Sequence, residues 1–144
     1  MSLLRIAALD EEDLKIVSAH TQDAILRVGD IDFQPNRSRL VLPLNRFAWE
    51  VKKRLFRQQN ERRNCVLQFD RVKGLRSMGI NRAETDALLS MLAIQFRETE
   101  APSGEIEITF SGNSAIRLDV ECIEARLTDL GAAWQASSRP AHGT

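Results

Sequence analysis

Residues 105–120, with the sequence EIEITFSGNSAIRLDV, carry the clearest structural signal in the chain. Apolar side chains occupy every second position on both sides of a Ser-Gly-Asn turn: Ile106, Ile108 and Phe110 before it, and Ile116, Leu118 and Val120 after it. Alternate side chains of a strand point to the same face, so each run buries one face and exposes the other. Two such runs joined by a short loop with Gly and Asn predict a β-hairpin.

Other segments outside this hairpin predict further strands. Residues 3–9 are a short apolar run, and alternating runs cover residues 30–33, 40–44, 65–70 and 92–97. The turn residues 34–38 lie between the first two of these alternating runs, which predicts a second hairpin. Pro43 lacks a backbone N–H, so it indicates a sheet edge or a bulge in that hairpin.

Two helices are predicted, one near each end of the chain. Asp10 is a good N-cap, and the acids that follow it suit the positive end of a helix over residues 11–21. Near the other end, Ile123, Leu127 and Leu130 are four and three residues apart, which is helical spacing. Gly131 is well placed to end this second helix.

These elements predict an α+β fold dominated by antiparallel strands. We expect a partly open barrel of about seven strands, one helix after the first strand and a C-terminal amphipathic helix. The order of elements resembles pleckstrin-homology-like domains, an analogy that says nothing about function. Residues 1–134 are expected to form a single globular domain and residues 135–144 a flexible C-terminal tail.

The composition limits the classes of protein and the cellular locations that fit this chain. The chain has 144 residues, 43% of them hydrophobic, and a formal net charge of zero, which argues against a protein whose whole body binds polyanions. Cys65 and Cys122 lie in apolar runs and are expected to be buried free thiols. A signal peptide and an apolar run of about 20 residues are both missing, so we expect a cytoplasmic location without membrane insertion.

Four stretches look familiar as a set: residues 27–30, 44–50, 115–125 and 129–134. Together they resemble Domain of Unknown Function 2948 (DUF2948), a family of small proteobacterial proteins, over the range from Leu3 to about Pro140. The resemblance implies a bacterial, cytoplasmic, single-domain protein. The family has no assigned activity, so the resemblance implies no catalytic residues.

Motifs for catalysis, metals and cofactors are missing. The two histidines, His20 and His142, fall at the end of the first helix and in the tail, and no Gly-x-Ser-x-Gly elbow is present. Asp30 and Asp32 share a strand face, but alternating acids are more typical of a solvated strand than of a metal site. No Walker or Gly-x-Gly-x-x-Gly loop occurs. We therefore predict no catalytic residue, no metal and no cofactor.

Residues 50–64 are the segment with the most functional interest, because six cations face two acids there. A loop of this kind can hold the phosphates or carboxylates of an anionic protein or nucleic acid. Two alternatives stay open: a solvated loop, or pairing with the acidic hairpin of residues 105–120. This hairpin lies within residues 98–130, which contain eight acids and two cations. Only Phe56 is interleaved as a stacking aromatic. The candidate contacts are Lys52, Lys53, Arg54, Arg57, Arg62 and Arg63.

Two functional hypotheses follow. The first is a non-enzymatic binding or adaptor module. Phe47, Trp49 and Trp134 have two interpretations: they lie in a homodimer interface, or they lie at the rim of the core. The second hypothesis is a small enzyme that acts through carboxylates and arginines in a pocket. Its candidate residues are Asp30, Asp32, Arg46 and Arg117.

Overall fold

The computed structural model describes residues 3–47 and 62–131 of the chain. These ranges contain one α-helix, α1 (Glu11–Thr21), and ten strands. The first five strands are β1 (Arg5–Ala8), β2 (Ile25–Arg27), β3 (Asp32–Gln34), β4 (Arg39–Phe47) and β5 (Arg62–Phe69). The other five are β6 (Val72–Met78), β7 (Leu88–Glu98), β8 (Gly104–Phe110), β9 (Ser114–Val120) and β10 (Ala125–Asp129).

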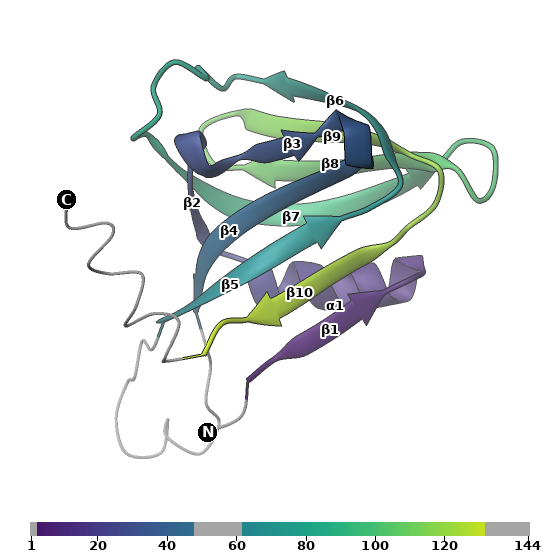
Figure 1. The fold of residues 1–144 in the computed structure, drawn as a ribbon, viewed down its shortest axis with the longest axis horizontal. Helices are drawn as coiled ribbons and strands as arrows, with labels where there is room; N and C mark the ends of the chain where they lie inside the picture. Colours follow the sequence, from purple (N-terminus) through teal and green to yellow (C-terminus); the bar gives the residue numbers. More distant parts are fainter. Residues whose placement is uncertain (1–2, 48–61, 132–144) are drawn as a thin grey trace.

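The strands form one antiparallel sheet in the order β1-β10-β5-β4-β2-β7-β8-β9-β6, with β3 paired to β4. Figure 1 shows that the sheet folds over, so that β7, β8, β9 and β6 face β4, β5 and β10. β7 belongs to both parts, because its first residues pair with β2 and the rest pairs with β8. The core lies between the two parts, and α1 packs against β7 and β1.

The hairpin predicted from residues 105–120 is confirmed as β8 and β9. Ile106 lies opposite Leu118, and Ile108 lies opposite Ile116. All four side chains are buried, with at most 1% exposure. The six apolar positions of this hairpin therefore face the core as one surface, and its polar positions face outward.

The helix predicted over residues 11–21 is also confirmed. The Asp10 side chain accepts a hydrogen bond from the Asp13 N–H at 2.8 Å and caps α1, while Leu14 and Val17 are buried. The second predicted hairpin is present as β3 and β4, with Phe33 opposite Leu40. On the β5 side Pro43 pairs with Val66, whereas β3 and β2 pair with other parts of β4. Among the described strands, Pro43 thus pairs with β5 alone, and the other side of β4 has no partner at this position.

The predicted C-terminal amphipathic helix is wrong, because residues 125–129 form β10. Ala125, Leu127 and Asp129 are buried, while the residues between them are partly exposed. β10 lies between β1 and β5 and pairs with both, so its backbone hydrogen bonds are made across the sheet. Asp129 occupies a buried position where an apolar residue is expected, and this hides the strand alternation in the sequence.

The predicted barrel of about seven strands is wrong as well. The described part of the chain has ten strands in an open sheet, whose end strands β1 and β6 do not pair with each other. The sequence prediction missed β2, which has only three residues, and β6, whose pairing with β9 is irregular near Gly74. The pleckstrin-homology-like analogy falls with the C-terminal helix. The predicted tail, residues 135–144, lies outside the described residues, as do Trp49 and Trp134.

A search of the described helices for membrane-spanning segments found none with enough length and apolar character.

Candidate anion-binding surface

Three arginines meet where β4 ends and β5 begins. In the register of this strand pair, Arg46 lies opposite Arg63, and Phe47 lies opposite Arg62. Because side chains alternate along a strand, Arg46 and Arg63 face the buried side and Arg62 and Phe47 face the outer side. Exposure agrees, since Arg46 and Arg63 are 6% and 8% exposed and Arg62 is half-buried. Neighbouring arginines therefore serve different sides of the sheet.

On the buried side, Arg46 forms a two-pronged ion pair with Asp129 of β10. The Arg46 Nε and Nη2 atoms donate to Asp129 Oδ1 and Oδ2 at 2.8 and 2.7 Å. The Leu4 N–H donates to the same carboxylate at 2.9 Å. Burial alone would raise the pKa of Asp129, but the hydrogen bonds from Arg46 and Leu4 and the charges of Arg46 and Arg63 hold it below its usual value. Arg46 is therefore neutralised and ties β4 to β10 and to the segment before β1.

Cys65 and His20 lie near this ion pair, whose charges act on the pKa of both groups. Burial raises the pKa of the Cys65 thiol to about 12, so it remains protonated at neutral pH. His20 is exposed at the end of α1, where burial and the Arg46 charge lower its pKa despite the opposing charge of Asp129. Both cysteines are free, Cys65 buried as predicted and Cys122 half-buried.

On the outer side, Arg62 is a cation held in place by neutral groups. Its guanidinium lies 4.0 Å from the centroid of the Phe47 ring. Nε donates to the Asn45 side-chain oxygen, and Nη2 donates to the backbone oxygens of Asn45 at 2.9 Å and Asp23 at 3.2 Å. Among the described residues no carboxylate forms an ion pair with it. The charge of Arg62 is thus fixed in position, and no acid of the described residues neutralises it.

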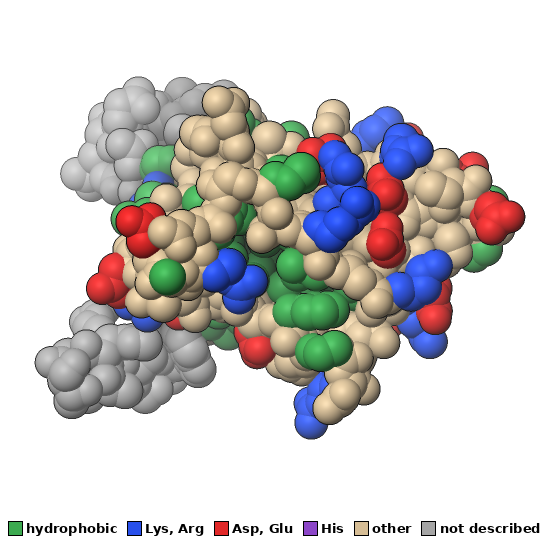
Figure 2. All heavy atoms as spheres, turned by 90° about the horizontal axis from the view of Figure 1, so that it is seen from above, with side chains coloured by type: hydrophobic (Ala, Val, Ile, Leu, Met, Phe, Trp, Pro, Cys, Tyr) green, Lys and Arg blue, Asp and Glu red, His purple; other side chains and the backbone are tan. Residues whose placement is uncertain are grey.

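The outer face of β6, β7, β8 and β9 shows the opposite behaviour, because its charges pair with one another. Arg97 and Arg76 both contact Glu105, the latter at 3.2 Å, and Arg117 contacts Glu107 at 3.5 Å. On the face seen in Figure 2, basic and acidic side chains accordingly lie next to one another. Arg76, which lies outside residues 50–64, is thus paired with the acidic hairpin.

The predicted contact residues are only partly placed. Lys52, Lys53, Arg54 and Arg57 lie outside the described residues. Arg62 faces the outer surface, and Arg63 faces the buried side. The sequence interpretation missed Asn45 and the backbone oxygen of Asp23, which hold Arg62. The register of β4 with β5 brings Asn45 next to Arg62, and this register is known only once the two strands are paired.

The four candidate residues of the enzyme hypothesis are not brought together. Asp30 contacts Arg27, and the Asp32 carboxylate accepts from the Gln34 amide at 2.7 Å. Arg46 and Arg117 are engaged with Asp129 and Glu107, in separate parts of the sheet. Within residues 3–47 and 62–131, no group of three or more His, Cys, Asp or Glu side chains is arranged to hold a metal ion.

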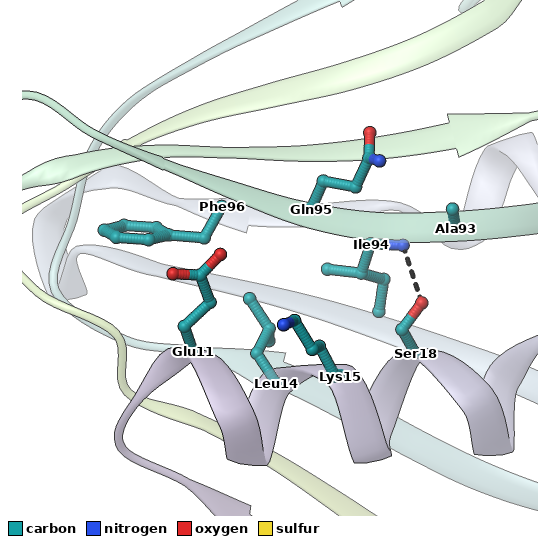
Figure 3. Close-up of a pocket in the computed structure, with 8 residues that line it drawn as sticks. All are labelled: Glu11, Leu14, Lys15, Ser18, Ala93, Ile94, Gln95 and Phe96. Carbon is teal, nitrogen blue, oxygen red and sulfur yellow. Dashed lines mark hydrogen bonds between the residues drawn. The ribbon is translucent and has the colours of Figure 1, made fainter.

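A groove of about 350 Å³ lies between α1 and β7 (Figure 3). Leu14, Ile94 and Phe96 make its apolar part, and Glu11 and Lys15 project from the helix toward the strand. The Ser18 hydroxyl accepts a hydrogen bond from the Ile94 N–H at 2.9 Å. This hydrogen bond connects the helix to the strand. The groove has room for a small molecule, but its lining does not bring catalytic groups together.

Comparison with known proteins gives a family and no function. A family model with the description "Protein of unknown function (DUF2948)" matches residues 4–142, in agreement with the resemblance seen in the sequence. Neither the curated proteins nor the solved structures contain a match to the chain.

Proposed function

The chain belongs to the DUF2948 family of proteins of unknown function, and from its surface we propose that it is a non-enzymatic binding module of the bacterial cytoplasm. We place its contact with an anionic partner at the basic end, which consists of Lys52, Lys53, Arg54, Arg57 and Arg62; Arg63, the sixth predicted contact, faces the buried side and is left out.

The observation that carries this proposal is the environment of Arg62. An arginine fixed by three hydrogen bonds to neutral oxygens keeps its full positive charge and has little side-chain freedom left to lose on binding. In contrast, the arginines on the outer face of β6 to β9 already have carboxylate partners. An incoming anion therefore gains more at the basic end than at the charge-paired face.

The sequence between β4 and β5 adds to this field. Residues 48–61, between the two strands, contain four cations and two acids, and Arg62 and Arg63 follow directly at the start of β5. A local excess of this kind attracts polyanions although the whole chain has zero net charge. Such binding weakens as salt rises, because counterions released from the polyanion drive it.

A heparin column eluted with a salt gradient tests the proposal. Replacement of Lys52, Lys53, Arg54 and Arg57 by Ala should lower the salt concentration needed for elution. The matched control is the Arg71→Ala, Lys73→Ala, Arg76→Ala and Arg97→Ala variant, which removes four charges from the other part of the sheet. Equal shifts for both variants, or no retention of the native protein, would contradict a localised anion site. Thermal unfolding by circular dichroism checks that both variants are folded.

A further inference from the structure

We infer that the outer face of β4, β5, β10 and β1 binds single-stranded nucleic acid, with Arg62 as a platform on which a base stacks. This inference rests on the proposed function, because it names the class of anion that the basic end receives. It uses only residues that the structure describes.

The hydrogen bonds that Arg62 already makes favour stacking of a base on its guanidinium over a two-pronged ion pair with a carboxylate. Carboxylates and phosphates bind arginine best through two parallel hydrogen bonds, and both edges of the guanidinium that allow this include Nη2. Here Nη2 already donates to the backbone oxygens of Asn45 and Asp23, and Nε donates to the Asn45 side chain. Each two-pronged edge therefore has its Nη2 donor already engaged, and only Nη1 is without a hydrogen bond to the described residues. A two-pronged grip on an acidic peptide is disfavoured.

Besides the N–H groups of Nη1, the flat faces of the guanidinium are what Arg62 can offer to a ligand. One face lies over the Phe47 ring at 4.0 Å, and the other points away from the ring on a half-buried residue. Unpaired bases stack on aromatic rings and on arginine planes in nucleic-acid complexes. Phe47 and the three hydrogen bonds hold this plane in a fixed orientation, so a base meets a preformed platform.

Amide groups lie directly beside the platform. Asn45 and Asn64 are opposite each other in the register of β4 and β5, and the Asn45 amide nitrogen donates to the Asn64 side-chain oxygen at 3.0 Å. The Asn64 amide nitrogen has no hydrogen-bond partner among the described residues, and Asn64 is partly exposed. The Asn64 oxygen has a second lone pair, so this amide can present a donor and an acceptor to the edge of a base, whereas a carboxylate needs donors only.

The next row of this face is free of acids. Pro43, Val66, Thr128 and Arg5 lie side by side across the four strands, a width of about 15 Å at the usual strand spacing. Along the described parts of β4 and β5, the next carboxylate on this face is Asp70, which is paired with Arg39 at 2.8 Å. The row beside Asn45 and Asn64 therefore carries one cation and no acid, which suits a nucleic-acid backbone that runs across the sheet.

Fluorescence anisotropy with a labelled oligothymidine of about 12 nucleotides tests the inference. Arg62→Lys keeps the charge but removes the plane, so it should weaken binding of the oligonucleotide by about tenfold, a typical loss for one stacked base. Binding of an abasic oligomer of the same length should be weaker than that of oligothymidine and unchanged by the substitution. Arg126→Lys, on the same face, is the matched control and should leave both affinities unchanged.

Asn64→Ala gives a second variant that leaves the Arg62 side chain itself unchanged, and it should also weaken oligothymidine selectively. Equal binding of oligothymidine and the abasic oligomer would overturn the inference and leave the proposed function standing. Tighter binding of a poly-glutamate peptide than of oligothymidine would have the same meaning. No binding of any of these polyanions would overturn the proposed function itself.

Discussion

Asp129→Ala should lower the free energy of unfolding by about 3–5 kcal/mol, which is the usual cost of removing one partner from a buried ion pair. The side chains of Arg46 and Asp129 are 7% and 0% exposed, so solvent cannot replace the lost carboxylate. The variant leaves the Arg46 guanidinium buried without its counter-charge. It also removes the acceptor of the Leu4 N–H, which contributes about 1 kcal/mol of that total.

Urea unfolding followed by far-UV circular dichroism measures this loss. A domain of this size has a total stability of about 5–15 kcal/mol, so the midpoint should fall strongly at a nearly constant m-value. The Arg46→Met, Asp129→Leu double variant should recover most of the loss, because two apolar side chains of similar volume remove both buried charges. Asp129→Asn should lie between, since its amide oxygen still accepts one hydrogen bond.

A loss below about 1 kcal/mol for Asp129→Ala would refute this reasoning, because that is the cost expected for an exposed pair. A double variant as unstable as the single variant would refute it in a second way. It would show that the cost comes from packing around Asp129 rather than from an uncompensated charge at Arg46.

Three further predictions concern pH, thiol reactivity and packing. The pKa of Asp129 in the folded protein lies below its unfolded value of 3.8, so the ionised carboxylate stabilises the fold above pH 3.8 and this stabilisation is lost as the pH falls through the folded pKa. The urea midpoint should therefore depend less steeply on pH in acid for the double variant at Arg46 and Asp129 than for the native protein. Cys65, with a pKa of about 12, should resist iodoacetamide at pH 8 in the folded protein and react in urea, as mass spectrometry would show; rapid labelling when folded would contradict its burial. Gly104→Ala should destabilise by about 1–3 kcal/mol, because a Cβ there would lie 2.5 Å from the Phe96 ring, and an unchanged midpoint in urea would count against that close packing.

The parts of the fold that were predicted from sequence are those in which each residue agrees with its own environment. β8 and β9 place apolar residues inward and polar residues outward without exception over Ile106–Phe110 and Ile116–Val120. Asp10 caps α1 as its local chemistry requires. Such elements need no knowledge of the rest of the chain.

The part that failed is the one in which a charge is buried. The inward positions of β10 are Ala125, Leu127 and Asp129, and the carboxylate is tolerated there only because Arg46 reaches it from a strand 83 residues away in sequence. No local pattern records that partner. The same sequence therefore read as a helix, with Ile123 and Leu127 as its apolar side.

Charge counting along the sequence located the basic segment but could not single out Arg62, on which we base the proposed contact. It grouped Arg62 with Arg63, although the two face opposite sides of the sheet. Which of them is neutralised depends on strand register, because register decides the side of the sheet and the opposing residue. That information is non-local, and it appeared only when β4 and β5 were paired.

The buried ion pair and the Arg62 platform are two sides of the same strand end. Asn45, Arg46 and Phe47 are consecutive, so Arg46 is anchored inward to Asp129 while Asn45 and Phe47 hold Arg62 on the outer face. Anchoring the middle residue fixes the backbone of its neighbours, and their side chains can then orient the guanidinium. On this argument the Arg46→Met, Asp129→Leu variant recovers stability but loses orientation. It should therefore bind oligothymidine more weakly than the native protein at equal stability, and undiminished affinity would separate the ion pair from the binding surface.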